Sequence, residues 1–440
     1  MNQKVNVLNG KVDQGVLLTK NFQLNYLSKA VRLSWMGLSL AASASQSATI
    51  EVTSNLDDGT DCTLREAVVS IGNSALESGC LNSTNAFGAN DTITFSVPTF
   101  TSSNNTITLT DGALNFSAAT SVVIDASMVS GGVVVNANQN SSVIEASSST
   151  LVVENLTLMG GSANSGGGLL VNNSSVTFIN SIISGNEANY GAGIHASGSQ
   201  ISLNNSTVSS NVANDGGGVS VNGSTLLNLK NSTVSGNSAA YGAGVYVSNY
   251  SAVELDNSTV SNNSASYGGG FYITFSSIVN LSSSTVSSNL AIENGGGIFT
   301  YDSNIILQNS IVANSVSGDD CYDSSTDAAI VNNVVSDVVS ILEDGSCGSG
   351  ARAIDPELLP LAEDGGLTMT HALSIESVAR NIVEAASCSI EDQRGELREV
   401  SDGFCDVGAY EFVESNGSLD GNNLFYVIPM GSNKAVVVPL

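Results

Sequence analysis

The sequence predicts an all-β fold: a right-handed parallel β-helix with about 26 residues per coil, a short N-terminal capping helix and a small C-terminal domain. Two repeated features predict the coils. A segment like Asn257-Ser-Thr-Val-Ser-Asn-Asn263 recurs every 25 or 26 residues, with clear copies starting at Asn180, Asn205 and Asn231. A Gly-x-Gly segment keeps the same step, from Gly166–Gly168 to Gly295–Gly297. A fixed period in this range is typical of solenoids.

Each repeat is expected to consist of strands. Short runs such as Val245-Tyr-Val and Ala252-Val-Glu-Leu-Asp alternate apolar and polar residues, which indicates half-buried strands. Gly, Asn and Ser between the runs supply turns that need a positive φ. Three short strands per repeat would form one coil, and coils would stack about 4.8 Å apart. Residues 91–150 have similar but less regular runs, so the β-helix is predicted to span 91–315.

Residues at the same repeat position should form files along the stack. The asparagines that end the repeated segment are expected to bond amide to amide at one corner: Asn186, Asn211, Asn237, Asn263 and Asn289. The apolar residues just after the glycines are expected to point inward: Ile194, Val219, Val245, Phe271 and Ile298.

Exposed ends of a solenoid need caps. Before the coils, Thr63 and Glu66 have the spacing of a capping box, which predicts a short helix whose Leu64, Ala67 and Val68 face the first coil. Arg65 is expected to pair with a nearby Asp, which favours a structural role over catalysis.

The charge of the chain is strongly acidic. The formal net charge is −28, from 12 basic and 40 acidic residues. Five of the basic residues, but only one acidic residue, precede Ala48. The remaining body would repel nucleic acid and anionic lipid, which excludes both as partners. No segment approaches the 20 apolar residues of a membrane span.

Export is predicted from the N-terminus and the cysteines. A basic leader, an apolar stretch near Val31–Ala42 and the small residues Ala42-Ser43-Ala44 predict a signal peptide over 1–44. An even number of cysteines predicts disulfides in an oxidising compartment. Six cysteines allow 15 pairings, and local pairing would join the first two and the last two. They are Cys62, Cys80, Cys321, Cys347, Cys388 and Cys405. The alternative of a zinc site lacks a Cys-x-x-Cys pair.

Residues 53–96 resemble the CSLREA domain of bacterial exported proteins. The matching pieces are Asp57-Asp-Gly, Cys62-Thr-Leu-Arg-Glu-Ala67 and Asp91-Thr-Ile-Thr-Phe95, with Thr63 where the family has Ser. Residues 355–412 resemble the choice-of-anchor Q family. Here the matching pieces are Asp355-Pro356, Gly365-Gly-Leu-Thr-Met-Thr-His371-Ala-Leu373, Asp392-Gln-Arg-Gly395 and Cys405-Asp-Val-Gly-Ala-Tyr-Glu411.

These resemblances imply an exported bacterial right-handed β-helix protein, and they imply no activity, since both families are defined by architecture. The coils are also similar, more weakly, to the repeats of polymorphic outer-membrane proteins. The predicted divisions are a signal peptide (1–44), a CSLREA-like cap (49–90), the β-helix (91–315), a choice-of-anchor Q-like domain (316–412) and a C-terminal tail (413–440).

Catalytic residues are sparse in the coils. A polysaccharide lyase needs a strong base, yet the only Lys or Arg between Asn155 and Asn309 is Lys230. Lys230 shares a repeat position with Asp256, which predicts a salt bridge between coils. A glycoside hydrolase needs two carboxylates about 5–10 Å apart. Glu254 and Asp256 lie at i and i+2 on one strand face, so they are the candidate pair. His195 is expected at the surface.

Aromatic residues favour binding instead. Tyr246, Tyr272 and Phe299 follow the glycines by two residues and should form an exposed outward file, whose rings could stack on sugars. The alternative is an aromatic ladder that covers the sheet or lies under a loop. Tyr190, Tyr241 and Tyr267 predict a second file at a turn.

No cofactor is predicted, except that Ca²⁺ is a candidate ligand for Asp57, Asp58 and Asp61; an Asp-rich turn without metal is the alternative. The sequence favours a non-catalytic secreted or cell-surface protein, on the outer membrane of a bacterium, for adhesion or glycan binding. Its partner would be a glycan or a host or neighbouring cell surface. The alternatives are a polysaccharide-degrading enzyme, as a glycoside hydrolase or lyase, and a structural envelope spacer.

Overall fold

A computed structural model describes residues 47–440 except 78, 83–86, 118–119, 326–333, 337–339, 345–346, 348–350, 399, 401–402, 414–424, 430–434 and 440. The predicted signal peptide and parts of the predicted C-terminal tail lie outside the described residues. Within the described part no helix is long and apolar enough to cross a membrane.

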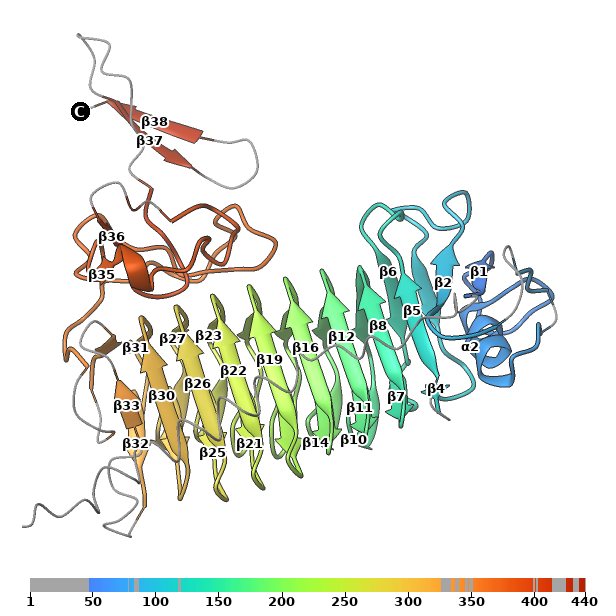
Figure 1. Ribbon diagram of the computed structural model, residues 1–440, viewed down its shortest axis with the longest axis horizontal. Coiled ribbons are helices and arrows are strands. Elements are labelled where there is room, and N and C mark those ends of the chain that lie inside the picture. The colour runs from blue at the N-terminus through green and yellow to red at the C-terminus, as the bar shows by residue number, and fades with distance from the viewer. Residues whose placement is uncertain are drawn as a thin grey trace, which may run out of the picture. The chain divides into compact units, whose positions relative to one another are not determined.

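Three parallel sheets wind around one core (Figure 1). Sheet I contains β1 (Thr49–Val52), β2 (Asp91–Phe95), β5 (Ser121–Asp125), β8 (Thr150–Glu154), β12 (Ser175–Ile179), β16 (Gln200–Asn204), β19 (Leu226–Lys230), β22 (Ala252–Asp256), β26 (Ile278–Ser282), β30 (Asn304–Gln308) and β33 (Val334–Ser336). Sheet II contains β3 (Thr106–Thr108), β6 (Val133–Asn136), β9 (Leu156–Met159), β13 (Ile182–Ser184), β17 (Thr207–Ser209), β20 (Thr233–Ser235), β23 (Thr259–Ser261), β27 (Thr285–Ser287), β31 (Ile311–Ala313) and β34 (Ile341–Leu342).

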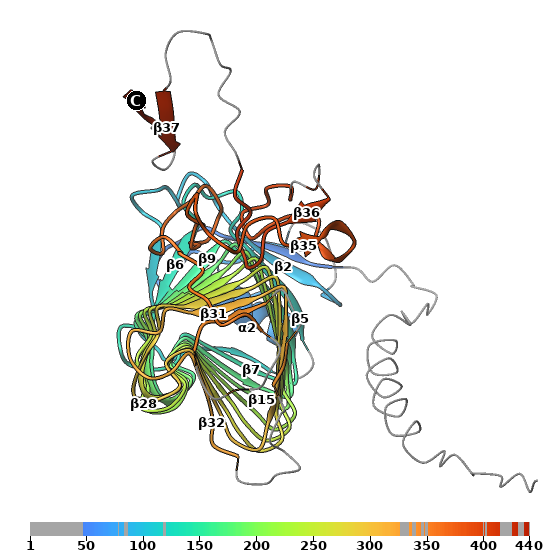
Figure 2. The same ribbon diagram turned by 90° about the vertical axis from the view of Figure 1, so that its left-hand side faces the viewer.

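Sheet III completes each coil before the chain returns to sheet I. It contains β4 (Leu114–Phe116), β7 (Ile144–Ser147), β11 (Leu169–Asn172), β15 (Ile194–Ser197), β18 (Val219–Asn222), β21 (Val245–Val247), β25 (Phe271–Ile273), β29 (Ile298–Thr300) and β32 (Cys321–Asp323). Short strands also pair at the corner between sheets II and III: β10 (Ser162–Ser165) with β14 (Glu187–Tyr190), and β24 (Ser264–Tyr267) with β28 (Leu290–Asn294). Viewed along the coils, the three sheets enclose the core (Figure 2).

The predicted register holds residue by residue. Val208, Val234, Val260 and Val286 are aligned on successive strands of sheet II and are completely buried. The five residues predicted to point inward from sheet III, from Ile194 to Ile298, are also 0% exposed. The Gly-x-Gly segments make the corner possible. Gly242 has a φ of +59°, and a Cβ on Gly244 would lie 2.5 Å from the carbonyl oxygen of Gly270 in the next coil.

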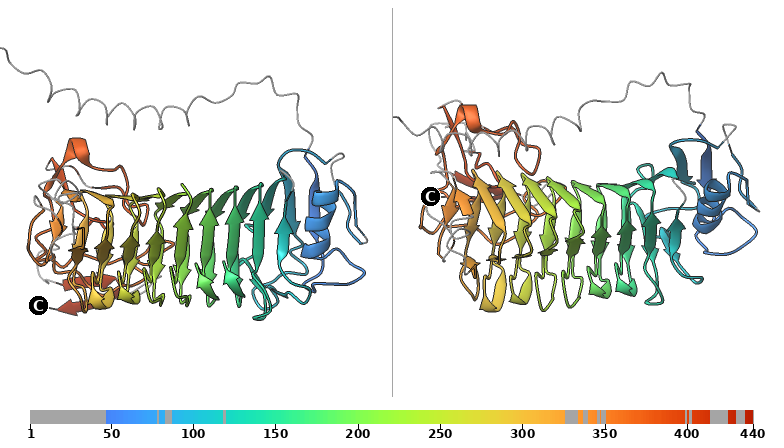
Figure 3. Two further views of the ribbon diagram at one scale, coloured as in Figure 1. Left: turned by 90° about the horizontal axis from the view of Figure 1, so that it is seen from below. Right: turned by 60° about the horizontal axis from the view of Figure 1, so that its bottom comes forward.

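The N-terminal cap is the predicted helix, α2 (Leu64–Asn73), which lies at the end of the stack (Figure 3). Thr63 and Glu66 form the capping box, and Leu64, Ala67 and Val68 are buried. Arg65 makes the expected ion pair, donating to Asp57 at 2.9 Å.

The sheets continue past residue 315, the predicted end of the β-helix, because β32, β33 and β34 each extend one sheet by another strand. The chain then runs back over the outside of the coils, where β35 (Val383–Glu384) pairs with β36 (Phe404–Cys405) next to a 3₁₀ turn, η1 (Ala385–Ser387). Near the C-terminus, β37 (Phe425–Pro429) and β38 (Ala435–Pro439) form an antiparallel hairpin.

Three disulfides join the cysteines that are close in sequence: Cys62–Cys80, Cys321–Cys347 and Cys388–Cys405. This is the local pairing among the possible connectivities. No group of three or more His, Cys, Asp or Glu side chains suited to a metal ion occurs among the described residues.

Candidate binding surface on sheet III

An inner file of aromatic rings runs along the outer face of sheet III. Tyr246, Tyr272 and Phe299 are aligned across β21, β25 and β29. Their ring centroids lie 5.5 and 4.8 Å apart and their planes are parallel within 3°, and Tyr322 extends the stack at 5.6 Å. The predicted file therefore forms. Its exposure is different from the prediction, because Phe299 is only 7% exposed and the stacked rings cover one another's faces.

An outer file covers the inner one at the corner between sheets II and III. Tyr241 and Tyr267 stack at 5.7 Å with planes 7° apart. Tyr241 also contacts Tyr272 edge to face at 5.3 Å, and Tyr267 contacts Phe299 in the same way at 5.7 Å. Edge-to-face packing of this kind contributes about 0.5–1.5 kcal/mol per pair. The covering by Tyr267 is the physical reason why Phe299 is buried.

Both files are interrupted in the coil that contains β18. The inner file reads His195, Ser220, Tyr246 at aligned positions of β15, β18 and β21. The outer file reads Tyr190, Asp215, Tyr241, joined by backbone bridges from Tyr190 to Asp215 and from Asp215 to Tyr241. One coil thus places a short acidic residue and a serine where its neighbours carry rings.

The interruption leaves Tyr241 at the end of a stack. Tyr267 covers one face of the Tyr241 ring, and the other face is directed toward the Asp215 position. Tyr241 is 40% exposed, and Tyr190 on the far side of Asp215 is 44% exposed. The Tyr190 ring leans toward His195, with centroids 6.3 Å apart and an angle of 56°. Of the predicted aromatic residues, Tyr241 therefore offers a ring face more fully than Tyr246, Tyr272 or Phe299.

The polar groups of this cluster are shifted by burial. Burial raises the pKa of the Asp215 carboxyl. Burial and the nearby Asp215 raise the pKa of Tyr246 to about 12. Burial lowers the pKa of His195, which favours its neutral imidazole. Among the described residues, neither the Asp215 carboxylate nor Nδ1 of His195 has a hydrogen-bond partner. His195 lies on the outer face, but it is half-buried rather than a free surface residue.

Asp215 was not among the residues predicted from sequence. The signal was present: in the file Tyr190, Asp215, Tyr241, Tyr267, one carboxylate interrupts a run of tyrosines. Because it does not continue the aromatic pattern, a search for aligned aromatic residues passes over it.

The acidic candidates on sheet I lie on a different face. Glu254 and Asp256 share the outward side of β22, as predicted. Nζ of Lys230 lies 3.8 Å from Asp256, which confirms the salt bridge between coils. Both partners are well exposed, and such a pair contributes at most about 1 kcal/mol. The Lys230 contact engages one of the two carboxylates that hydrolysis would need.

The three Ca²⁺ candidates differ in burial. Asp57 is buried, and its two carboxylate oxygens accept from Arg65 and from the backbone N–H groups of Thr110 and Asp111. Asp58 and Asp61 are exposed. The hydrogen bonds that Asp57 accepts from Thr110 and Asp111 tie the cap to the first coils.

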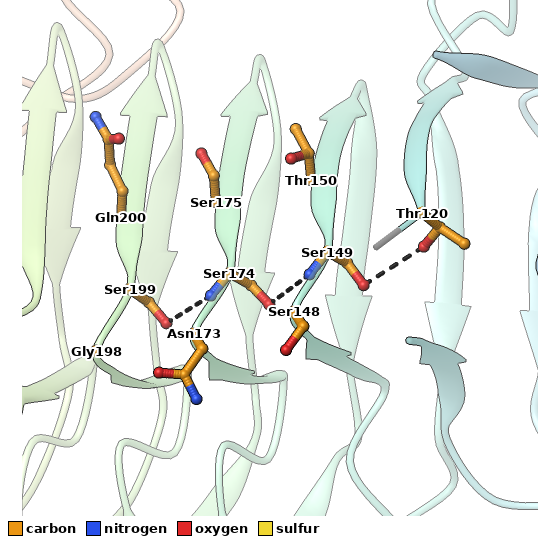
Figure 4. A pocket seen from close by; sticks show the side chains of 10 residues that line it. All are labelled: Thr120, Ser148, Ser149, Thr150, Asn173, Ser174, Ser175, Gly198, Ser199 and Gln200. Atoms are coloured by element: carbon orange, nitrogen blue, oxygen red, sulfur yellow. Dashed lines mark hydrogen bonds between the residues drawn. The ribbon is translucent and has the colours of Figure 1, made fainter. Parts of the chain in front are cut away.

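A separate candidate is a cavity between sheets III and I, near the N-terminal end of the stack. It is an open cavity of about 510 Å³ lined by hydroxyl and amide side chains (Figure 4). Along its floor, Ser174 accepts from the N–H of Ser149 at 3.0 Å, and Ser199 accepts from the N–H of Ser174 at 3.1 Å. These hydroxyls already serve the coils, and the lining contains no charged or aromatic residue. The cavity is a weaker candidate than the tyrosine corner, which is formed by Tyr190, Asp215 and Tyr241 where sheets II and III meet.

The segment that resembles choice-of-anchor Q lies against sheet II, and its polar residues make contacts within the protein. Gln393 is 2% exposed; it accepts from Thr259 at 2.6 Å and donates to Thr233 at 2.9 Å. Nε2 of His371 lies 2.8 Å from the Ser261 hydroxyl. Arg398 and Glu411 form a completely buried ion pair at 3.1 Å. Gln393 and His371 therefore fasten this segment to the coils, and Arg398 adds a hydrogen bond to Oδ1 of Asn257 at 3.2 Å.

Comparison with known proteins agrees with this fold. A family model described as "Right handed beta helix region" matches residues 167–335. No curated protein sequence matches the chain. One similar solved structure is titled "Crystal structure of pectate lyase Pel9A"; it is 12% identical, with a TM-score of 0.45, over 83% of this chain and 96% of that chain. Similarity at that level carries no argument about activity. The chain thus contains a right-handed parallel β-helix, with coils of about 26 residues.

Proposed function

We propose that this protein is an exported, non-catalytic β-helix protein that a bacterium secretes or displays on its surface. We propose further that it binds glycans through the corner formed by Tyr190, Asp215 and Tyr241. The observation that carries the proposal is the exposed end face of the Tyr241 stack next to an unpaired carboxylate. Aromatic faces pack on the C–H faces of sugar rings, and carboxylates accept hydrogen bonds from sugar hydroxyls.

Export is supported by the disulfides, because such bonds persist in oxidising compartments and are rare in the cytosol. The finer assignment to CSLREA and choice-of-anchor Q proteins is part of the proposal. It draws support from the motif residues of both segments: Arg65 donates to the carbonyl oxygens of Gly112 and Ala113 in the first coils, and Gln393 donates to Thr233 on sheet II.

Tyr241→Ala tests the proposal. A glycan array probed with the protein identifies a ligand, and titration calorimetry then measures its affinity. Loss of the ring face should weaken binding about 5- to 10-fold, the equivalent of about 1 kcal/mol of stacking. Tyr250→Ala is the matched control, because Tyr250 is 73% exposed and lies in the turn between β21 and β22, away from both files.

Other outcomes would favour the alternatives. If the array shows no ligand, the structural envelope spacer is the better description. If polysaccharide is cleaved and cleavage stops in Glu254→Gln, the chain is a polysaccharide-degrading enzyme that uses the Glu254 and Asp256 face. If Tyr241→Ala and Tyr250→Ala bind alike, the tyrosine corner is not the binding surface.

A further inference from the structure

The chemistry of the interrupted outer file indicates what kind of sugar it would take. We infer that the site between Tyr190 and Tyr241 selects a saccharide ring that carries a protonated amino group, with the ammonium on Asp215 and the ring on Tyr241. This inference rests on the proposed glycan-binding function and specifies its ligand.

The first step concerns size. Tyr190 and Tyr241 stand two coils apart, with Asp215 between them in the aligned file. Two strand spacings amount to about 10 Å. A ring held between two walls at van der Waals contact of about 3.5–4 Å on each side needs about 7–8 Å. The aligned positions of Tyr190 and Tyr241 are therefore far enough apart along the stack to admit one sugar ring over Asp215, whereas the stacked neighbours Tyr241 and Tyr267, 5.7 Å apart, leave no room for one between them.

The second step concerns charge. The Asp215 carboxylate is half-buried and lacks a hydrogen bond or ion pair among the described residues. The only Lys or Arg in coils 155–309 is Lys230, which contacts Asp256 on sheet I. A partly desolvated carboxylate without a cation is satisfied better by an ammonium than by a neutral hydroxyl.

The third step concerns the surroundings. Ring faces attract cations as well as sugar C–H groups, and Tyr241 presents such a face to the Asp215 position. The whole chain has a net charge of −28, which concentrates cations and excludes anionic sugars such as uronates. An amino sugar can stack on the ring face, pair with the carboxylate and be attracted by the net negative charge. A neutral or acidic sugar can make fewer of these interactions.

The test compares three oligosaccharides of equal length by titration calorimetry with the full chain: chitosan hexamer, its fully N-acetylated counterpart and cellohexaose. The chitosan hexamer should bind at least about tenfold more tightly than the other two. Asp215→Asn should remove that preference by lowering chitosan affinity about tenfold while leaving the neutral hexamers within about twofold of the unmodified protein.

A matched control separates the site from general attraction to an acidic protein. Glu293→Gln removes an equal charge from an exposed residue of β28, at the same corner but farther along the stack, and it should leave chitosan binding unchanged. If Glu293→Gln weakens binding as much as Asp215→Asn, the attraction is nonspecific and the inference is wrong. It is also wrong if oligolysine binds equally well and this binding survives Tyr241→Ala, since a ring would then be unnecessary.

Failure of this inference is distinguishable from failure of the proposed function. Equal binding of all three hexamers, sensitive to Tyr241→Ala but not to Asp215→Asn, would leave glycan binding intact and refute the preference for amino sugars. Absence of binding to every glycan would refute both.

Discussion

At the scale of single residues, the buried asparagines form a file of side-chain hydrogen bonds that runs from coil to coil, parallel to the backbone hydrogen bonds. Nδ2 of Asn211 donates to Oδ1 of Asn237 at 3.0 Å, and Nδ2 of Asn237 donates to Oδ1 of Asn263 at 2.9 Å. Each amide also accepts from a backbone N–H and donates to a carbonyl oxygen, as Asn237 does with the N–H of Asn211 and with Val208. All hydrogen-bonding groups of the interior amides are thus satisfied without water.

Asn237→Ala should lower the free energy of unfolding by about 3 kcal/mol or more. The substitution leaves several buried donors and acceptors unpaired, and each costs about 1–3 kcal/mol. Urea titration followed by circular dichroism measures the change. Asn189→Ala is the control, because Asn189 belongs to an exposed amide file with Asn164 and Asn214, where water replaces the lost bonds. Equal losses in the two variants would contradict this account.

At the scale of elements, the C-terminal segment depends on a neutral histidine. Nδ1 of His371 lies 2.7 Å from the carbonyl oxygen of Leu359, to which it must donate, so Nε2 accepts from the Ser261 hydroxyl. Burial lowers the pKa of His371. Between the folded and unfolded pKa values the unfolded chain binds a proton that the folded chain does not, so the contribution of His371 to stability is lost as the pH falls below about 6.5.

The unfolding midpoint of the unmodified protein should therefore fall more steeply between pH 7.5 and pH 5 than that of His371→Asn, and the two curves should converge at low pH. The comparison cancels other groups, including Glu411. Burial and the neighbouring Asp406 raise the pKa of Glu411 to about 7, so its effect on stability has the opposite sign. Parallel curves for the two proteins would show that His371 is not the group responsible.

The period of the sequence was sufficient to predict the coils, the inward residues such as Val245 and the asparagine file, because these depend only on contacts between neighbouring repeats. It could not predict where the C-terminal segment lies. Gln393 contacts Thr259 across 134 residues, and nothing in the repeat specifies that pairing. The burial of Phe299 was missed for a related reason: it depends on Tyr267 folding over it from a different file.

At the scale of the whole molecule, each coil contacts mainly its neighbours, so stability is approximately a sum over coils and their interfaces. The excess of acidic residues lowers the stability of every coil through charge repulsion. Carboxylates repel one another more strongly in the stacked coils than in an expanded unfolded chain, since stacking brings them closer together. Lys230 and Asp256, an attractive surface pair among the described residues, are both exposed.

Salt should therefore stabilise this protein. Raising NaCl from 0.01 M to 0.15 M shortens the screening length from about 30 Å to about 8 Å. Repulsion across several coils is then removed, while the loss from the exposed Lys230 pair is at most about 1 kcal/mol. The urea midpoint should rise with NaCl and equally with KCl, because screening does not distinguish the two cations. A flat or falling midpoint would mean that local ion pairs outweigh the repulsion. A rise with only one of the salts would point to binding of that cation at a defined site.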